Sequence, residues 1–582
     1  MATSEQSTSL KGNEGRVALQ KRSILGRAQL SILICLFALT LAGAAVRFVA
    51  LDCGLPVTAD ADRIIVGQGQ AFDMLGRGEQ PTRPPSALYP HALGRILGAL
   101  PGEYAPHAPA GASLEDHLAA ASSPDLTARR LIAFLSLFLI PATYLLARRF
   151  LAQRPSLLAA GLIAFSILSV SYSRQARPHG ALALCMTMSL IASMWYARRG
   201  TFASLVTASA AAALALSMLH SGAAILPALA VALLLRWRKD GLRTYPRLLV
   251  PIIFVASFTW MFYPFMFDPK PGPGRGFPDQ ILNGAGFQVI ARGMAGSEPV
   301  IACLALIGIV LGLARLPRTW KASTWELRSD LLVVGAFVIP YLTVVGMFFR
   351  SWPRFMLPVI PVFACLAAAA VAWVAQPIAR RIRSEGTRNR LAISLGAVVL
   401  ILPGCAAARY TWLHSQQTPR EAAAKWVTEH LDPNKDTLVY MESFALPLLE
   451  DPKTLRSYPK HILSLLQHYQ LANDDDNWLE GHAIWKVQHL YTQPLPAPGV
   501  AEQVSELHDC YVVLQSKSKR AVPIKKLLLD TGGKLVFSEH RRYGFLFKWG
   551  LERGSRLLDN NLFSYALFRT GTGASTEIYH LP

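Results

Sequence analysis

The sequence has little charge. Only 16% of its 582 residues are charged and 52% are hydrophobic, whereas about a quarter of the residues in soluble domains are charged. The mean hydropathy is +0.30. A membrane span needs about 20 mostly apolar residues, and the chain contains many such runs. This composition argues against a soluble protein with one anchor and predicts a polytopic membrane protein.

Acidic residues are scarcer than basic ones, 37 against 58, which gives a net charge of +21. The basic residues cluster in short loops after alternate apolar runs, as expected for cytoplasmic loops. No helix-turn-helix, zinc-finger or aromatic RNA-binding motif occurs. We therefore expect membrane lipids, and no nucleic acid, among the partners. The clusters are Arg148, Arg149 and Arg154; Arg198 and Arg199; Arg236, Arg238, Lys239 and Arg243; Arg315, Arg318 and Lys321; and Arg380, Arg381, Arg383, Arg388 and Arg390.

Cysteine is also rare, and only Cys53 and Cys510 of the seven cysteines are predicted to lie outside the membrane. One bridge between them is possible, but two unpaired thiols are the favoured interpretation. No cysteine spacing indicates zinc. The chain lacks G-x-G-x-x-G after a strand and lacks a P-loop. This disfavours an ATP-driven transporter or a nucleotide-sugar synthase, and leaves a donor already on the outer face, most simply one carried by a lipid phosphate.

The apolar runs predict about eleven spans. A polar and basic N-terminal tail, 1–27, should stay in the cytoplasm. This places the loop 52–129, two short turns, the segment 268–297 and everything after about 413 outside. We thus predict a transmembrane helical domain over 28–412 and an extracytoplasmic domain over 413–582, in the plasma (inner) membrane. The predicted spans are 28–51, 130–148, 155–172, 179–197, 203–219, 221–236, 247–267, 298–315, 331–349, 355–375 and 391–412.

The tail from about 413 is polar and mixed, which indicates a small α/β domain. Thr418-Pro-Arg-Glu421 is typical of a capping box with proline at the first helical position, so a helix should follow through Leu431. The remaining pattern predicts four strands. They are 437–441, 510–514, 534–537 and 543–547.

The first predicted outer loop opens with two carboxylates, Asp60 and Asp62. A carboxylate beside an apolar membrane face is poorly solvated, and its raised proton affinity suits a general base. The same D-x-D pattern could hold Mg²⁺ or Mn²⁺, which prefer oxygen ligands. Two solvated loop acids would show the same spacing. The sequence leaves these three interpretations open.

Positive charge on the predicted outer side runs against the topological bias. Arg174 and Arg177 lie in one outer turn, and Arg350 and Arg354 lie in another. They could snorkel to lipid headgroups, but arginine also suits phosphate because its planar donors pair with two oxygens. We favour anion recognition.

Two further outer segments contain weaker candidates. Tyr89 could stack on a sugar ring or pack at the membrane interface. Asp268 and Lys270 could contact substrate or pair with each other.

Several stretches resemble the multispanning glycosyltransferases of family 39, the aminoarabinose-transferase-like and protein-mannosyltransferase-like group with the C-type fold. Thr58–Ile65 with Leu88–Pro90 is similar to the first outer loop of the family, which begins with acid and later carries Tyr-Pro. The other matching stretches follow in the family's order and on the predicted sides. They are Tyr172–Pro178, Pro353–Pro361 and Thr418–Val427.

The resemblance implies that the first-loop acid is the catalytic base. The family usually has Asp-Glu there, whereas this chain has Asp60 and Ala61, so Asp62 could replace the missing carboxylate. His179 stands where related sequences often carry Asp. The candidate ligands of the substrate and lipid phosphate are Arg63, Tyr89, Arg174, Arg177, His179, Asp268, Lys270, Arg350 and Arg354.

The resulting hypothesis is an inverting transfer of a hexosyl or pentosyl group on the outer face, from a polyprenyl-phosphate sugar to a glycan, lipid or protein acceptor. A transporter or lipid flippase is the alternative, but transporters place ionisable residues in their spans and show repeats. The predicted spans are nearly free of Asp, Glu and Lys. An inactive scaffold for envelope assembly remains a third interpretation.

Overall fold

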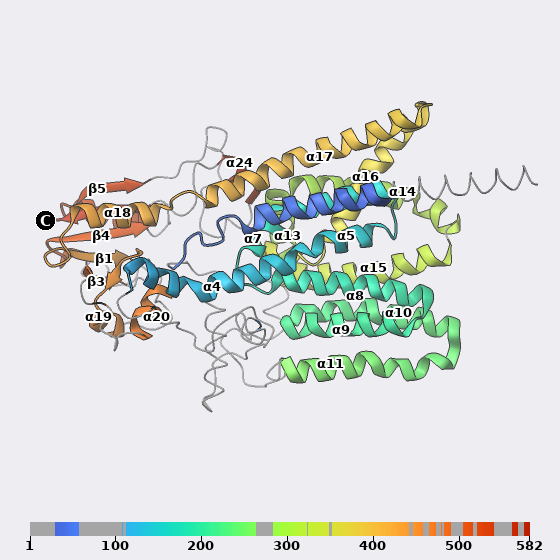
Figure 1. Cartoon of the computed structure of the whole chain (residues 1–582), viewed down its shortest axis with the longest axis horizontal. Helices are drawn as coiled ribbons and strands as arrows, with labels where there is room; N and C mark the ends of the chain where they lie inside the picture. The colour runs from blue at the N-terminus through green and yellow to red at the C-terminus, as the bar shows by residue number, and fades with distance from the viewer. Residues whose placement is uncertain are drawn as a thin grey trace, which may run out of the picture.

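A computed structural model places most of the chain in one helical bundle with a sheet domain at one end (Figure 1). We call the end of the bundle next to the sheet the domain end, and the opposite end the far end. The residues that the structure describes are 29–56, 93, 108, 112–262, 283–322, 324–348, 352–441, 446–457, 465–472, 479, 482–490, 504–515, 521–539, 562–568 and 576–582.

The membrane-type helices match the predicted runs one by one. In this described part, seven helices are long and apolar enough to cross a membrane, or nine when each of two bent pairs counts as one span. Two shorter apolar helices correspond to the remaining predicted runs. The protein is therefore a multi-pass helical membrane protein. The helices are Gln29–Phe48, α4 Leu114–Leu137, α5 Leu139–Ala147, α6 Gln153–Ala164, α7 Ile167–Ser173, α8 His179–Arg199, α9 Phe202–Met218, α10 Leu226–Asp240, α11 Leu249–Phe262, α13 Ala285–Ser297, α14 Pro299–Ala322, α15 Trp325–Met347, α16 Ile360–Arg381 and α17 Glu385–His414.

Two spans are interrupted, and both interruptions matter for the site. The axes of α6 and α7 meet at 49°, and those of α13 and α14 meet at 116°. Short 3-10 helices join other elements in the described residues: η1 His220–Ile225, η2 Gly241–Leu248 and η4 Pro353–Met356. A break in a membrane helix frees backbone groups, which must find partners inside the protein.

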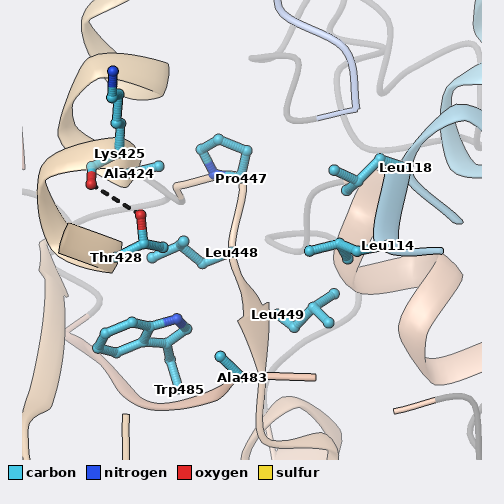
Figure 2. A pocket seen from close by; sticks show the side chains of 10 residues that line it. All are labelled: Leu114, Leu118, Ala424, Lys425, Thr428, Pro447, Leu448, Leu449, Ala483 and Trp485. Atoms are coloured by element: carbon cyan, nitrogen blue, oxygen red, sulfur yellow. Dashed lines mark hydrogen bonds between the residues drawn. The ribbon is translucent and has the colours of Figure 1, made fainter. Parts of the chain in front are cut away.

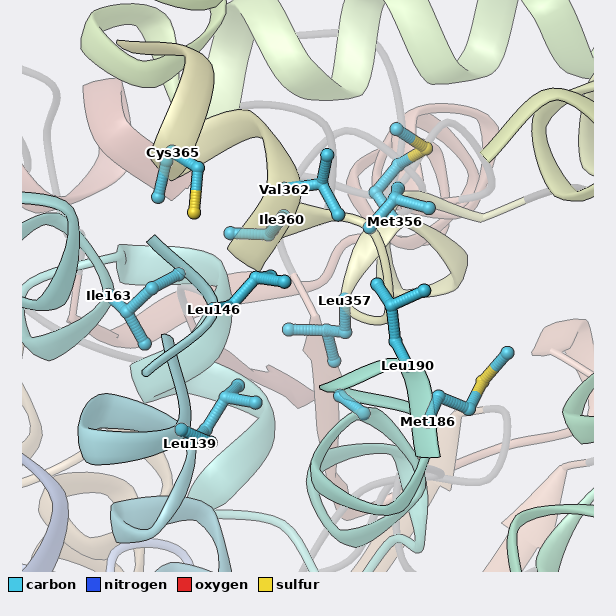
Figure 3. Packing of buried hydrophobic residues seen from close by; sticks show 14 of the residues in the cluster. Leu139, Leu146, Ile163, Met186, Leu190, Met356, Leu357, Ile360, Val362 and Cys365 are labelled. Carbon is cyan, nitrogen blue, oxygen red and sulfur yellow. The ribbon is translucent and has the colours of Figure 1, made fainter. Parts of the chain in front are cut away.

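The bundle core is dense and mostly aliphatic. Side chains of α5, α6 and α8 point toward the segment that runs from η4 into α16 (Figure 3). Met356 and Leu357 are 0% and 1% exposed at that segment. Their burial fixes η4 against the bundle, although η4 itself has only one turn.

Helices α14 and α16 approach so closely that only glycine fits at Gly308. A Cβ there would lie 2.3 Å from the backbone oxygen of Leu366, and backbone cannot move aside as a flexible side chain can. We expect Gly308→Ala to destabilise the bundle by about 1–3 kcal/mol, the usual cost of overpacking. Thermal unfolding of the purified protein in detergent measures this.

Gly396 in α17 provides the control, because nothing lies within 4 Å of a Cβ built there. Gly396→Ala should leave the unfolding temperature unchanged or raise it slightly, since alanine favours helix over glycine. Equal unfolding temperatures for the two variants would contradict the close packing of α14 on α16.

The C-terminal part forms a six-stranded mixed sheet with the order β2-β3-β1-β4-β6-β5. Strands β2, β3, β1 and β4 are parallel, and β6 runs antiparallel to β4 and β5. Helix α18 packs on one face. Ile524 and Leu528 of α22 join the apolar cluster on the other. The strands are β1 Thr437–Met441, β2 Leu449–Glu450, β3 Ile484–Leu490, β4 Cys510–Gln515, β5 Lys534–Glu539 and β6 Thr576–Leu581; the helices are α18 Pro419–His430, α19 Pro452–Ser457, α20 Leu465–Ala472, α22 Ala521–Asp530 and α24 Leu562–Phe568.

The predicted α/β character is confirmed, with some strands missed. The strands predicted at 437–441, 510–514 and 534–537 correspond to β1, β4 and β5. The fourth, 543–547, lies outside the described residues. The capping box is present: the Glu421 amide donates to Thr418 Oγ1 at 3.2 Å, and the Thr418 amide donates to Glu421 Oε2 at 2.8 Å. Cys53 and Cys510 are not joined by a disulfide.

Three helices connect the bundle with the sheet domain (Figure 1). Helix α17 leads directly into α18. Helix α4 extends beyond the bundle, and its Ala121 joins the core of the sheet domain. Helix α24 packs against α7, α13 and α17, and its Leu562 and Ala566 are buried in the bundle core.

Candidate functional site

The turn between α7 and α8 carries three of the predicted site residues. Helix α7 ends at Ser173, and α8 begins at His179 directly after Pro178. Proline disfavours helical backbone at the residue before it, so a turn separates the two helices. This turn, with Arg174, Arg177 and His179, lies at the domain end, because Tyr410 near the end of α17 donates a 2.9 Å hydrogen bond to Ser171.

The Arg174 guanidinium binds backbone carbonyl groups and not a carboxylate side chain. Its Nη2 donates to the carbonyl oxygen of Ala50 at 2.6 Å, and its Nη1 lies 3.4 Å from the carbonyl oxygen of Val46 and from Thr411 Oγ1. Only 5% of the residue is exposed. Arg174 therefore ties the end of the first helix to α7 and α17.

Arg129 of α4 binds the backbone that follows Ala50. Its Nη1 donates to the carbonyl oxygens of Leu51 and Cys53, at 2.6 and 3.1 Å. The amide of Leu466 in α20 donates to the carbonyl oxygen of Pro56 at 3.3 Å. The chain from 46 to 56 is thus fixed where it enters the predicted first outer loop.

Arg354 lies on η4, which two contacts hold in place. Met356 packs into the core (Figure 3), and Tyr341 Oη of α15 donates to the carbonyl oxygen of Phe355 at 2.5 Å. The Arg354 guanidinium lies over the rings of Trp352 and Phe355, 4.9 and 5.5 Å from their centroids. Within the described residues, its buried Nε has no hydrogen-bond partner and the side chain forms no ion pair.

His179 lies between the two arginine-bearing segments. Its ring stacks on Phe355 with centroids 6.2 Å apart and is 6.1 Å from the Tyr172 ring. The guanidinium groups of Arg177 and Arg354 both act electrostatically on it. Its buried Nδ1 also has no hydrogen-bond partner in the described part. We call Arg177, His179 and Arg354 the basic cluster.

The structure thus brings together three predicted site residues from two distant parts of the chain, with Arg174 in the same turn. The other predicted site residues lie outside the described residues, and their placement stays a prediction. They are Asp60, Asp62, Arg63, Tyr89, Asp268, Lys270 and Arg350.

Sequence reasoning missed three charged residues that shape this end of the bundle: Arg47, Arg129 and Glu298. Arg47 and Glu298 lie inside predicted apolar spans and are buried, with 0% and 4% exposed. A charged side chain in a span is costly, so it usually has a partner and a role. That signal was present in the sequence and would have identified both.

No described group of three or more His, Cys, Asp or Glu side chains could hold a metal ion. Asp60 and Asp62, the predicted metal ligands, lie outside the described residues. A bound Mg²⁺ or Mn²⁺ therefore stays a prediction.

A separate cavity of about 240 Å³ lies in the sheet domain, where it meets α4 (Figure 2). Its lining is mostly apolar. Leu118 of α4 lines the cavity, whereas Ile132 of α4 lies near Gly180, the residue after His179. At 1.5 Å per helical residue these positions are about 21 Å apart, so the cavity is distinct from the basic cluster. It is lined by Leu114, Leu118, Ala424, Lys425, Thr428, Pro447, Leu448, Leu449, Ala483 and Trp485.

Residues 116–263 match a family model described as dolichyl-phosphate-mannose-protein mannosyltransferase. No curated protein matches the sequence significantly. The matched segment extends from α4 to the end of α11 and includes Arg129 and the turn with Arg174, Arg177 and His179.

The solved structures that resemble this chain have low sequence identity and TM-scores below 0.5. ArnT from Cupriavidus metallidurans, bound to undecaprenyl phosphate, is 15% identical, with 87% of this chain and 96% of that chain covered and a TM-score of 0.41. The oligosaccharyltransferase AglB from Archaeoglobus fulgidus, in complex with an inhibitory peptide and a dolichol-phosphate, is 13% identical, with 71% and 62% covered and a TM-score of 0.43. The family match therefore covers the part of the helical bundle from α4 to α11, and this part is similar to the dolichyl-phosphate-mannose-protein mannosyltransferases.

Proposed function

We propose that this protein transfers a sugar from a polyprenyl-phosphate carrier to an acceptor at the domain end of the bundle, on the outer face of the plasma (inner) membrane. The observation that carries the proposal is the basic cluster. Two guanidinium groups and a histidine converge there from α7–α8 and η4, and buried nitrogens of Arg354 and His179 lack partners among the described residues.

A phosphate would satisfy these groups. Arg177 and Arg354 are half-buried, where an anion stabilises a cation more than it does in water, and arginine donates two parallel hydrogen bonds to phosphate oxygens. In the proposed complex, Arg177 and Arg354 bind the donor phosphate and stabilise the charge that grows on it as the sugar leaves. Such electrostatic stabilisation usually lowers a reaction barrier more than any other single effect in an enzyme. The description of the matching family, which names a dolichyl-phosphate sugar, supports a donor of this class.

The fixed segment 46–56 supports the proposed base. Asp60 follows Pro56 by four residues, and the chain before it is held by Arg129, Arg174 and α20. We propose that the Asp60 carboxylate, or Asp62 in its place, removes the proton of an acceptor hydroxyl or other polar group.

The proposed reaction is a single displacement. The acceptor atom, with its electron pair, bonds to the anomeric carbon, and the bond from that carbon to the phosphate oxygen breaks. The lipid phosphate leaves with the bonding electrons, which inverts the anomeric centre. Arg174 contributes by holding the chain at Ala50, just before the loop that carries Asp60. We keep Arg63, Tyr89, Asp268, Lys270 and Arg350 as further candidate contacts to a hexosyl or pentosyl donor.

Transfer of radiolabel from a purified polyprenyl-phosphate sugar tests the proposal. The purified protein should transfer label to an acceptor fraction of cell envelope in detergent, where no membrane gradient exists. Movement of the lipid across vesicle membranes without transfer would support the flippase alternative instead. If the protein shows neither transfer of label nor movement of the lipid, the result would support the inactive scaffold.

A further inference from the structure

Glu298 occupies the break between α13 and α14 with its side chain turned into the protein. Its Oε1 accepts hydrogen bonds from Ser166 Oγ at 2.6 Å and from the Leu168 amide at 2.7 Å. Both donors belong to the first turn of α7, where helix amides lack intrahelical partners and an anion is favoured. The carboxylate therefore caps α7 from another span.

Arg47 caps the opposite side of the break between α6 and α7, whose α7 side is capped by Glu298. Its Nη1 donates to the carbonyl oxygen of Ala164 at 2.8 Å, and its Nη2 donates to that of Ile163 at 3.1 Å. These are the last carbonyls of α6, where a cation is favoured. Arg47 also donates to Ser169 Oγ at 3.0 Å and interacts electrostatically with Glu298. The interruption between α6 and α7 thus has a cation at one helix end and an anion at the other.

Glu298 also connects the two segments that carry the basic cluster. On one side it fixes α7, which leads directly into the turn with Arg177 and His179. On the other side it follows α13, which packs on η4. A Cβ on Gly293 of α13 would lie 2.8 Å from Pro353 Cγ. The next residue after Pro353 is Arg354.

We propose that Glu298 is a positioning residue that sets the separation of the Arg177 and Arg354 guanidinium groups. The inference rests on the proposed function, since the separation matters only if both groups bind one phosphate. Loss of the carboxylate would free the start of α7 from α13 and change that separation. Misplacement by about 1 Å can cost roughly 100-fold in a reaction that depends on orientation.

The experiment measures the Kd of purified full-length protein for a polyprenyl phosphate in detergent, and KM against kcat for the lipid-linked sugar. Glu298→Ala should raise Kd and KM by about 10- to 100-fold and lower kcat less. Glu298→Gln should stay within about threefold of wild type, because its amide oxygen can still accept both hydrogen bonds. If Glu298→Ala fails to fold, Ser166→Ala, which removes one donor, should raise Kd by about 3- to 10-fold.

Asp330 provides the matched control. It is a fully buried carboxylate that accepts from Arg149 and Arg198 at the far end of the bundle. Asp330→Asn should lower the unfolding temperature without changing Kd. Three results would overturn the inference. The first is an unchanged Kd in folded Glu298→Ala, and the second is an equal loss of affinity in Glu298→Ala and Glu298→Gln. The third is a rise of Kd in Asp330→Asn as large as that in Glu298→Ala. A wild-type protein that binds no polyprenyl phosphate would instead overturn the proposed function.

Discussion

Asp60→Asn should lower sugar transfer by about 100- to 10,000-fold, the usual contribution of a general base. The amide keeps the size of the side chain but cannot accept the acceptor proton. The bond to the anomeric carbon would then have to form from a protonated acceptor. Radiolabel transfer from the lipid-linked sugar measures the rate. Membrane insertion and unfolding temperature should match wild type, because asparagine has nearly the same size and shape as aspartate.

Asp62→Asn decides which of the two carboxylates is the base. If Asp60 is the base, Asp62→Asn should retain most of the activity. The reverse pattern would transfer the role to Asp62. Wild-type rates in both variants and in the double variant would remove the first-loop acids from the reaction. If Mg²⁺ or Mn²⁺ restored activity to a single variant at high concentration, the pair would instead be assigned to metal binding.

Removing the two guanidinium groups of the basic cluster should give the second large effect. A hydrogen bond to a charged group contributes about 1.5–3 kcal/mol, which corresponds to roughly 10- to 150-fold in Kd. We therefore expect Arg354→Ala or Arg177→Ala to raise the Kd for a polyprenyl phosphate by that factor. The double variant should lose about 100- to 10,000-fold, with some departure from additivity because the two groups bind one ligand.

The control for arginine loss is Arg315→Ala. Arg315 lies on α14 toward the far end, and its guanidinium lies over the ring of Trp373 at 4.9 Å, much as Arg354 lies over Trp352. Its removal takes away a similar cation–π contact without touching the basic cluster, so Kd should not change. The phosphate assignment would be wrong if Arg354→Ala and Arg315→Ala had the same small effect. Arg354→Lys should recover only part of the affinity, since lysine cannot donate two parallel bonds.

The spans could be predicted because two independent patterns agree. Most of the apolar runs are long enough to cross a membrane, and basic residues such as Arg198 and Arg199 follow alternate runs. The helix breaks could not be predicted in this way. Residues 153–173 are apolar on both sides of the 49° bend, so mean hydropathy does not change there. Strand β3 was missed because its pattern, with Lys486 and Gln488 on either side of Val487, is short and depends on parallel partners distant in sequence.

The candidate site was predicted in part for a similar reason. Arg177 and Arg354 stood out because positive charge is unusual on the predicted outer side. Their convergence on His179 needs the three-dimensional packing of α13, η4 and α7, which one sequence does not encode in any local pattern. The sequence marks Glu298 as a charge at the start of an apolar run, but its contact with the start of α7 depends on the fold.

Helix α24 has a practical consequence for how this protein can be handled. Its Leu562 and Ala566 are as buried as residues of the spans themselves, among α7, α13 and α17. A truncated chain ending after α17 would therefore expose apolar side chains of the helical bundle that α24 covers. A soluble fragment starting at α18 would expose the apolar face of α24 to water. Crystallisation or labelling strategies that treat the two halves as detachable modules would begin from material that aggregates.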